Sequence, residues 1–345
     1  MAASYVVAGC RTPVGKFLGG LSSLRSVELG GHAIAAAVLR AGLTTDEIDQ
    51  VIMGQVVQAG AGQAPARQAS TLAGLAPRVG AVTVNKVCGS GLYAVMLADM
   101  AIRAGEYQKV VAGGMESMSQ APHLLRNCRG GWKYGDQPMI DALDHDGLRC
   151  AQLGVSMGCI AEWVAKESKI SRHAQDAWAV RSHLRASSNR DGFAAEIVPL
   201  TVFEAKKPVV RSSDEGPRND CNLEMLGKLT PVFSSSLLGS EQSTHQATVT
   251  AGNASTLSDG AAALVVVNEA IHRTTKTDWA FRIVGHCHHA GQHQQLFTAP
   301  VGAVKSLLQK TKHAVADVDL FEINEAFAAQ TLACIDELGL DPDRV

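Results

Sequence analysis

Cys88 lies in the run Val84-Asn85-Lys86-Val87-Cys88-Gly89-Ser90-Gly91-Leu92, between a strand-like segment and a long apolar segment typical of a helix. The first turn of a helix offers N–H groups without intrahelical partners and a partial positive charge, and both favour a thiolate. The pattern therefore indicates a nucleophilic cysteine suited to thioester exchange, in which the thiolate takes an acyl group and releases a thiol. The alternative interpretation is an inert, buried cysteine.

Two further loops could contribute polar groups to such chemistry. Asn324 opens the run Asn-Glu-Ala-Phe-Ala at a predicted strand-to-helix turn, where it could hold a water or a carbonyl oxygen facing the nucleophile. Plain N-capping of the helix by Asn324 explains the same position. Ser255 ends the small-residue loop 251–255, which predicts either a simple turn or a surface along which a narrow ligand arm passes.

Histidines gather at residues 286–293, with Cys287 among them. A metal site needs ligands that converge, whereas alternate side chains at a strand end point to opposite faces. The sequence therefore argues against a metal site. The glycine-rich spots at 60–62 and 113–114 do not form a phosphate-binding fingerprint.

The elements around these residues predict an α/β protein. Strand-like and helical segments alternate over residues 1–118, which favours a mainly parallel sheet covered on both faces. The apolar segment 92–103 is predicted to be a buried central helix. Residues 119–248 have a looser texture, with a helix over 172–185 that Ser171 is expected to cap and a Ser-rich loop over 234–246. The α/β pattern returns at residue 249.

Composition narrows the class of protein. The chain has 345 residues and a net charge of −2, so no large electrostatic field favours nucleic acid. Its eight cysteines are scattered without a Cys-x-x-Cys pair, which favours a reducing compartment. We expect no secretory signal, no apolar stretch long enough to span a bilayer, and a cytoplasmic location, with a mitochondrial or peroxisomal address left open.

With these residues in view, the chain resembles the thiolase family of acetyl-CoA C-acyltransferases over essentially all of residues 4–345. The motifs that carry the resemblance are residues 11–17, 62–68, 85–92, 112–119, 146–148, 250–255 and 324–330.

The resemblance implies two similar βαβαβαββ halves in a five-layer arrangement, with a loop domain inserted in the first. The expected division is residues 1–118 plus 249–270 for the N-terminal half, 119–248 for the loop domain, and 271–345 for an incomplete C-terminal half. The resemblance also implies a homodimer or homotetramer. No metal, flavin or nicotinamide is implied, and CoA serves as a substrate.

The implied reaction interconverts two acyl-CoA molecules with 3-ketoacyl-CoA plus CoA. Cys88 would carry the acyl group, its N–H would contribute to one oxyanion hole, and Asn324 would hold a water in the other. The residues implied to hold the adenine and pantetheine of CoA are Leu148, Met157, Arg218, Phe233, Ser255, Ala326 and Phe327.

The chain departs from the family pattern in several ways. Thiolases carry a Gly-His-Pro histidine and a Cys-x-Gly-Gly-Gly cysteine that this sequence lacks. General acid–base steps contribute about 10²–10⁴-fold each, so we expect impaired condensation. Ser156 stands where short-chain members often carry a histidine, which leaves longer acyl chains open. The loop 234–246 is longer than the resemblance leads us to expect.

A second hypothesis belongs to a different class of protein. The missing acid–base residues are also compatible with a non-catalytic protein that binds CoA thioesters or dimerises on a thiolase scaffold. A ketoacyl synthase is a neighbouring interpretation, but the Asn-Glu-Ala-Phe run at 324–327 favours a thiolase.

Overall fold

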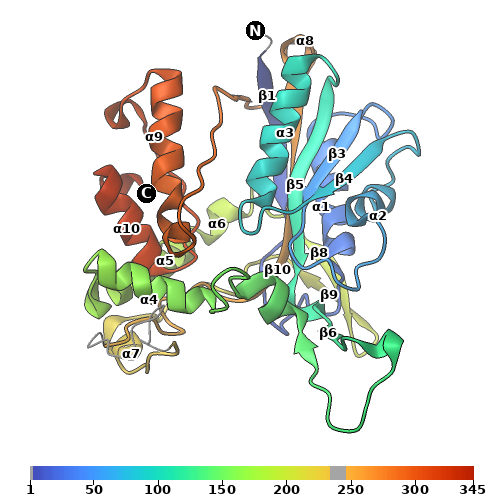
Figure 1. The fold of residues 1–345 in the computed structure, drawn as a ribbon. Helices are drawn as coiled ribbons and strands as arrows, with labels where there is room; N and C mark the ends of the chain where they lie inside the picture. Colours follow the sequence, from blue (N-terminus) through green and yellow to red (C-terminus); the bar gives the residue numbers. More distant parts are fainter. Residues whose placement is uncertain (1–2, 234–245) are drawn as a thin grey trace. The chain divides into compact units, whose positions relative to one another are not determined.

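The computed structural model describes residues 3–233 and 246–345 and divides the chain into two compact units (Figure 1). Unit 1 comprises residues 1–147, 190–216 and 257–283, and unit 2 comprises 148–189, 217–256 and 284–345. The residues of the predicted loop domain, 119–248, are shared between the two units: 119–147 and 190–216 belong to unit 1, and 148–189 and 217–248 to unit 2. The predicted loop at 234–246 lies outside the described residues except for Gln246.

Unit 1 is built on a seven-stranded sheet with the order β11-β1-β10-β5-β3-β4, and β2 pairs with β10. The strands of this sheet are β1 (Ser4–Arg11), β2 (Gly15–Lys16), β3 (Gln50–Gly54), β4 (Gly80–Val84), β5 (Lys109–Ser117), β10 (Ser258–Asn268) and β11 (Phe281–Arg282). Two hairpins join β6 (His123–Leu124) to β7 (Ile140–Asp141) and β8 (Leu200–Glu204) to β9 (Lys207–Arg211).

The sheet is mixed: the prediction of a mainly parallel sheet holds for the pairs among β3, β4 and β5 and fails at β10. Strand β3 pairs with β4 and β5 in parallel, whereas β10 pairs with β1 and β5 antiparallel. The reason is that β10, which comes late in the chain, inserts between β1 and β5 with the opposite direction. Alternation of strands and helices along residues 1–118 gives no sign of this insertion.

Helices cover both faces of the sheet, as predicted (Figure 1). Helices α1 (Ser26–Arg40) and α2 (Pro65–Leu72) lie on one face, and α3 (Ser90–Ala104) lies on the other. Shorter helices in this unit are α6 (Arg190–Phe193) and α8 (Glu269–Thr274). Apolar residues spaced along one side of α1, such as Leu29, Ile34 and Val38, are buried against the sheet.

Helix α3 is only partly buried, in contrast to the prediction of a central helix. Ala94, Ala98 and Ile102 face the core, whereas Leu92 is 71% exposed and Met100 is 41% exposed. The segment Val87–Ala104 is long and apolar enough to cross a membrane, by length and composition alone, so the expectation that no stretch would reach that length is wrong. Its buried side instead packs on β3 and β5, as in the core of a globular domain.

Unit 2 is helical in its described residues. Its helices are α4 (Met157–Glu167), α5 (Arg172–Ser188), α7 (Leu223–Gly227), α9 (Ala299–Thr311) and α10 (Ala328–Leu338). Short 3-10 turns lie at His293–Thr298, Val315–Asp317 and Pro342–Arg344. Ser171 caps α5 by accepting a hydrogen bond from the Ala174 nitrogen, so the predicted cap is confirmed.

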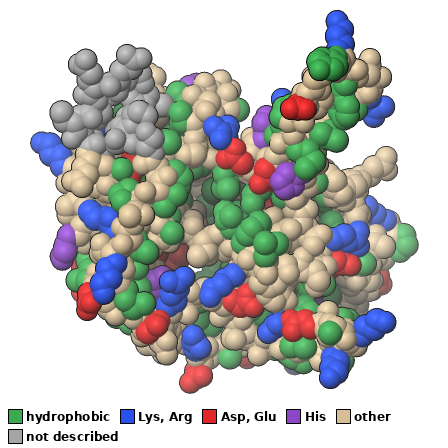
Figure 2. All heavy atoms as spheres, turned by 90° about the horizontal axis from the view of Figure 1, so that it is seen from below, with side chains coloured by type: hydrophobic (Ala, Val, Ile, Leu, Met, Phe, Trp, Pro, Cys, Tyr) green, Lys and Arg blue, Asp and Glu red, His purple; other side chains and the backbone are tan. Residues whose placement is uncertain are grey.

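Charged side chains of both signs are interspersed on the face drawn in Figure 2. Lysine and arginine alternate there with aspartate and glutamate instead of forming one large basic patch. This distribution agrees with the net charge of −2.

Candidate active site

Cys88 lies in unit 1 between the end of β4 and the first residue of α3, and the residue is exposed. The chain turns sharply just before it, since Val87 has a φ of +50°. Gly54 of β3 lets the start of α3 come close, because a Cβ on Gly54 would lie 2.6 Å from the main-chain carbon of Ser90. The thiol therefore stands at the tip of a strand-to-helix elbow.

The electrostatics of this thiol differ from the expectation. Although the residue as a whole is exposed, neighbouring atoms partly withdraw the thiol from water, and this desolvation raises the pKa of Cys88. A hydrogen bond from its own main chain acts in the opposite direction and is smaller. Burial at the elbow therefore opposes the lowered pKa that the sequence pattern predicted for this thiol.

The other candidate residues belong to unit 2, where several of them meet. Phe327 is buried in an apolar cluster with Met157, Phe233 and Ala326. The rings of Phe233 and Phe327 meet edge to face, with 6.4 Å between their centroids. Glycine at position 158 of α4 is required for this arrangement, because a Cβ there would lie 2.3 Å from the Phe233 ring.

Ser255 lies beside the same cluster. Its main-chain nitrogen donates a 3.0 Å hydrogen bond to the Ala326 carbonyl oxygen, and Ala254 forms an isolated β-bridge with Phe327. The structure thus brings Ser255 together with the four predicted substrate residues of the apolar cluster.

Arg218 and Leu148 are not members of this cluster. The main-chain nitrogen of Arg218 donates to His183 Nδ1 of α5 at 3.3 Å. Leu148 lies at the first residue of unit 2, at the end of a π-helical turn over Leu143–Leu148.

Asn324 is exposed and does not cap a helix, so the N-capping interpretation is wrong. Helix α10 begins four residues later at Ala328, with Phe327 at its N-cap position. The Asn324 carbonyl oxygen accepts a 3.0 Å hydrogen bond from the Ala326 nitrogen, which forms a tight turn.

Glu325 ties this turn to α5. Its two carboxylate oxygens accept hydrogen bonds from Trp178 Nε1 at 2.7 Å and from Ser182 Oγ at 2.6 Å. Charge-assisted hydrogen bonds of this kind are roughly twice as strong as neutral ones. Glu325 therefore orients the segment that carries Asn324, Ala326 and Phe327.

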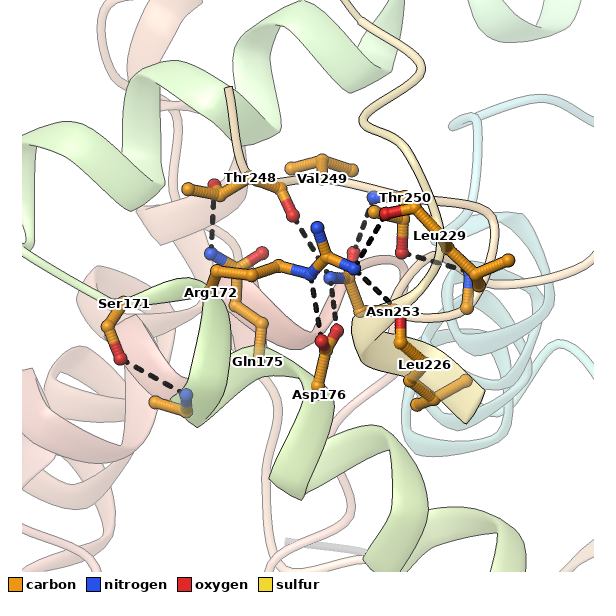
Figure 3. Close-up of polar contacts among 12 residues, drawn as sticks. Ser171, Arg172, Gln175, Asp176, Leu226, Leu229, Thr248, Val249, Thr250 and Asn253 are labelled. Atoms are coloured by element: carbon orange, nitrogen blue, oxygen red, sulfur yellow. Dashed lines mark hydrogen bonds and ion pairs between the residues drawn. The ribbon is translucent and has the colours of Figure 1, made fainter. Parts of the chain in front are cut away.

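Polar residues that sequence reasoning missed hold the loop that carries Ser255 (Figure 3). Asn253 Nδ2 donates to the Asp176 carboxylate at 2.9 Å, and its Oδ1 accepts from the Thr250 nitrogen at 2.8 Å. Arg172 Nε donates to the other Asp176 oxygen at 2.8 Å, and its Nη2 reaches the carbonyl oxygens of Leu226 and Leu229. The only feature of the sequence that could have pointed to this support is the polar residue Asn253 within the run Gly-Asn-Ala-Ser.

The buried carboxylate of Glu162 completes this support. It accepts hydrogen bonds from the main-chain nitrogens of Thr248 and Val249, at 2.8 and 2.7 Å, and from the Thr248 hydroxyl. The Gln175 amide also donates to the Thr248 hydroxyl at 3.0 Å. The loop 248–255 is therefore anchored to α4 and α5 at its start and to the 326–328 segment at its end.

No metal centre is found in the described part of the chain, where no three histidine, cysteine, aspartate or glutamate side chains converge. A cavity of about 140 Å³ lies within unit 1 at the start of α1, lined by Arg25, Gln55 and Ser117 among others. Cys88 does not line it, and we assign it no part in substrate binding.

Comparison with known proteins identifies the family. A model of the thiolase N-terminal domain matches residues 4–270, and a model of the thiolase C-terminal domain matches residues 277–345. These matches give no support to the expectation of a truncated second half.

Curated relatives agree with these matches. The Acetyl-CoA acetyltransferase of Escherichia coli is 44% identical over 343 residues, 99% of this chain and 84% of that protein. A Probable acetyl-CoA acetyltransferase of Mycolicibacterium smegmatis is 43% identical over 343 residues, 99% of this chain and 86% of that protein. A Probable acetyl-CoA acyltransferase of Staphylococcus aureus is 42% identical over 344 residues, 99% of this chain and 85% of that protein. The chain belongs to the thiolase family.

Proposed function

We propose that this chain is an acyltransferase that interconverts acyl-CoA plus acetyl-CoA with 3-ketoacyl-CoA plus CoA through an acyl group on Cys88. The observation that carries the proposal is the exposed thiol at the tip of the elbow between β4 and α3. The names of the relatives, which are acetyl-CoA acetyltransferases and acyltransferases, support CoA thioesters as substrates.

In the first half-reaction the Cys88 sulfur attacks the carbonyl carbon of an acyl-CoA. The bond between that carbon and the CoA sulfur breaks, and the proton of the Cys88 thiol ends on the departing CoA sulfur. We assign the Cys88 N–H, which lies at the start of α3, to the hole that stabilises the oxyanion of this step. Because burial raises the pKa of Cys88, a general base that accepts the thiol proton would favour this step.

We assign the apolar cluster of unit 2 to the pantetheine arm of CoA. Met157, Phe233 and Phe327 offer an apolar wall, and Ser255 and Ala326 border it with main-chain polar groups. Leu148 is assigned to the same arm and Arg218 to the adenine end, and the exposed Asn324 side chain is assigned to the water of the second oxyanion hole.

We also propose that the protein self-associates as a homodimer or homotetramer. Strand β4 is an edge strand of the sheet, with no outer partner among the described residues, and an unpaired edge is a template for pairing with another chain. The segment between β6 and β7 exposes Trp132, Tyr134 and Met139, which supports a second contact.

The remaining assignments follow the family. We propose a cytoplasmic protein of fatty acid metabolism whose eight cysteines are free thiols, as they are in the structure. We retain the inserted loop domain at residues 119–248 and the duplicated halves as proposals. Separate family matches over residues 4–270 and 277–345 support a division of the chain near residue 270.

Thiolysis tests the proposal. Acetoacetyl-CoA and a longer 3-ketoacyl-CoA are incubated with CoA and the 345-residue protein, with the Cys88→Ala variant as control. We expect cleavage that depends on Cys88. Absence of turnover in a folded protein that still binds the thioester would favour a binding protein and overturn the proposal.

A further inference from the structure

The turn before Cys88 places Val87 in a conformation that valine rarely adopts. Its φ of +50° lies in the left-handed region, where a β-branched side chain is crowded. Such outliers persist only where surrounding groups hold them, and they cluster at functional sites. The groups that hold Val87 therefore decide where Cys88 lies.

The Asn85 side chain contacts both this turn and a neighbouring loop. Its Oδ1 accepts a hydrogen bond from the Val87 nitrogen at 2.9 Å, and its Nδ2 donates to the Val56 carbonyl oxygen at 3.1 Å. The Val56 nitrogen in turn donates to the Glu116 carboxylate of β5 at 2.7 Å. An amide can make both contacts, whereas a carboxylate in the same shape lacks the donor for Val56.

Ser90, the first residue of α3, also restrains this turn. Its buried hydroxyl donates to the Val87 carbonyl oxygen at 2.6 Å and accepts from the Lys86 nitrogen at 2.8 Å. Both main-chain polar groups of Val87 are thus bound by side chains. Ser90 restrains the carbonyl side, and Asn85 restrains the N–H side and links the turn to the loop after β3.

We propose that Asn85 is a positioning residue for Cys88: its amide holds Val87 in the left-handed conformation and ties the elbow to Val56. This inference rests on the proposed role of Cys88 as the acylated nucleophile. Asn85 acts through Val87 and does not itself touch the acyl group in this account.

A substitution at Val87 can separate a positioning role of Asn85 from a general effect of Asn85 on stability. Glycine adopts a positive φ without steric cost, so Val87→Gly should make the Asn85 restraint dispensable. Val87 is 47% exposed, and its side chain contributes little packing to lose. If Asn85 only stabilised the fold, the effects of the Asn85 and Val87 substitutions would add, and the double variant would not recover acylation of Cys88.

The experiment compares Asn85→Ala, Asn85→Asp, Val87→Gly and the double variants that combine each Asn85 change with Val87→Gly. Gln58→Ala is the matched control, because the Gln58 amide donates to the main-chain carbonyl of Gln55 in the same loop and not to the turn at Val87. Two readouts are used: acylation of Cys88 by acetyl-CoA, and the pH profile of Cys88 alkylation by iodoacetamide, resolved from the exposed Cys128 by peptide mass spectrometry.

We expect Asn85→Ala and Asn85→Asp to slow acylation roughly ten- to hundredfold, and Val87→Gly to restore most of that loss. The midpoint of Cys88 alkylation should move down toward that of an ordinary thiol in the Asn85 single variants, because a relaxed turn returns the thiol to water. The double variants should regain the parent midpoint, and Gln58→Ala should match the parent throughout.

Parent-like acylation and alkylation in Asn85→Ala would overturn the inference, as would the lack of recovery in both double variants. If the parent protein is not acylated at all, the proposed function fails, but the alkylation profiles still test whether Asn85 positions Cys88. If Asn85→Ala does not fold, the Asn85→Asp pair with and without Val87→Gly provides the same comparison.

Discussion

Asn253 donates a 2.9 Å hydrogen bond from its side-chain amide to the Asp176 carboxylate, and both residues are buried (Figure 3). The same Asn253 binds the Ala328 nitrogen through its main-chain oxygen at 2.9 Å. One asparagine therefore connects α5 to the segment that opens α10. The position of Ser255, two residues further on, depends on this connection.

Asn253→Ala should lower the free energy of unfolding by about 1–3 kcal/mol, because it leaves the buried Asp176 carboxylate with one partner fewer. Chemical denaturation of the full chain measures this effect. The matched control is Asn222→Ala, which removes an exposed asparagine that caps the short helix α7 and should cost about 1 kcal/mol. An Asn253→Ala variant as stable as the parent, beside a measurable loss in that control, would contradict the account.

Glu325→Ala should change the environment of Trp178, since the indole N–H loses its carboxylate acceptor. We expect a stability loss of about 1–3 kcal/mol and a shift in tryptophan fluorescence. Glu325→Gln keeps an oxygen for the indole and should show the smaller effect on both measurements. Equal effects of the two variants would show that the hydrogen bond to Trp178 contributes nothing.

The eight cysteines should separate by reactivity toward a disulfide reagent at mildly alkaline pH. Burial raises the pKa of both Cys10 and Cys334 to about 11, so these thiols should react only after unfolding. Cys88 and Cys128 are exposed and should react before unfolding, and Cys88→Ser should remove one equivalent from that fast phase. An unchanged fast phase in Cys88→Ser would contradict the placement of Cys88 at an exposed elbow.

Glu116 should make stability depend on pH. Burial raises the pKa of this carboxyl from 4.5 to about 7, against the opposing hydrogen bonds from Val56 and Val57. Between these values the folded protein keeps a proton that the unfolded chain has released. The free energy of unfolding therefore falls as the pH rises through that window, by at most about 3 kcal/mol, and stays lower above it.

Glu116→Gln cannot titrate, so it isolates this contribution. Denaturation of the parent and of this variant across the same pH range should show the parent losing stability relative to the variant as the pH rises. Parallel curves for the two proteins would show that Glu116 has the same pKa in the folded and unfolded states.

Val82→Lys should weaken self-association, because it places a charge on the exposed edge strand β4. Sedimentation velocity should show a smaller species than the parent. Leu39→Lys is the matched control, since Leu39 is exposed on α1 away from that edge and its replacement should leave the assembly unchanged. Loss of assembly in the control, or none in Val82→Lys, would contradict a β4 interface.

Local sequence patterns predicted most helices and strands, and long-range pairing explains the errors. Ser171 before a helical run predicted the start of α5 correctly, because capping depends on neighbouring residues alone. The antiparallel insertion of β10 between β1 and β5 could not be predicted, because the partners lie far apart in the chain. The sequence placed Cys88 at a strand-to-helix turn, but its raised pKa depends on surroundings that local patterns do not encode.

The segment around Asn324 shows the same limit. An asparagine before an apolar run is typical of an N-cap, yet α10 begins at Ala328. The intervening residues are held by Glu325 contacts to α5 and by Ser255, and these tertiary contacts outweigh the local capping preference. Asn253 and Asp176 went unnoticed because neither residue matches a motif of its own.

Covalent acylation of Cys88 tests the central claim most directly. The protein is mixed with acetyl-CoA, quenched in acid and examined by intact and peptide mass spectrometry, with Cys88→Ser as the control. We expect the mass of one acetyl group on the peptide that contains Cys88, its absence from the control, and its removal when CoA is added. A folded protein that binds acetyl-CoA without acquiring that group, or that acquires it on another residue, would contradict the account.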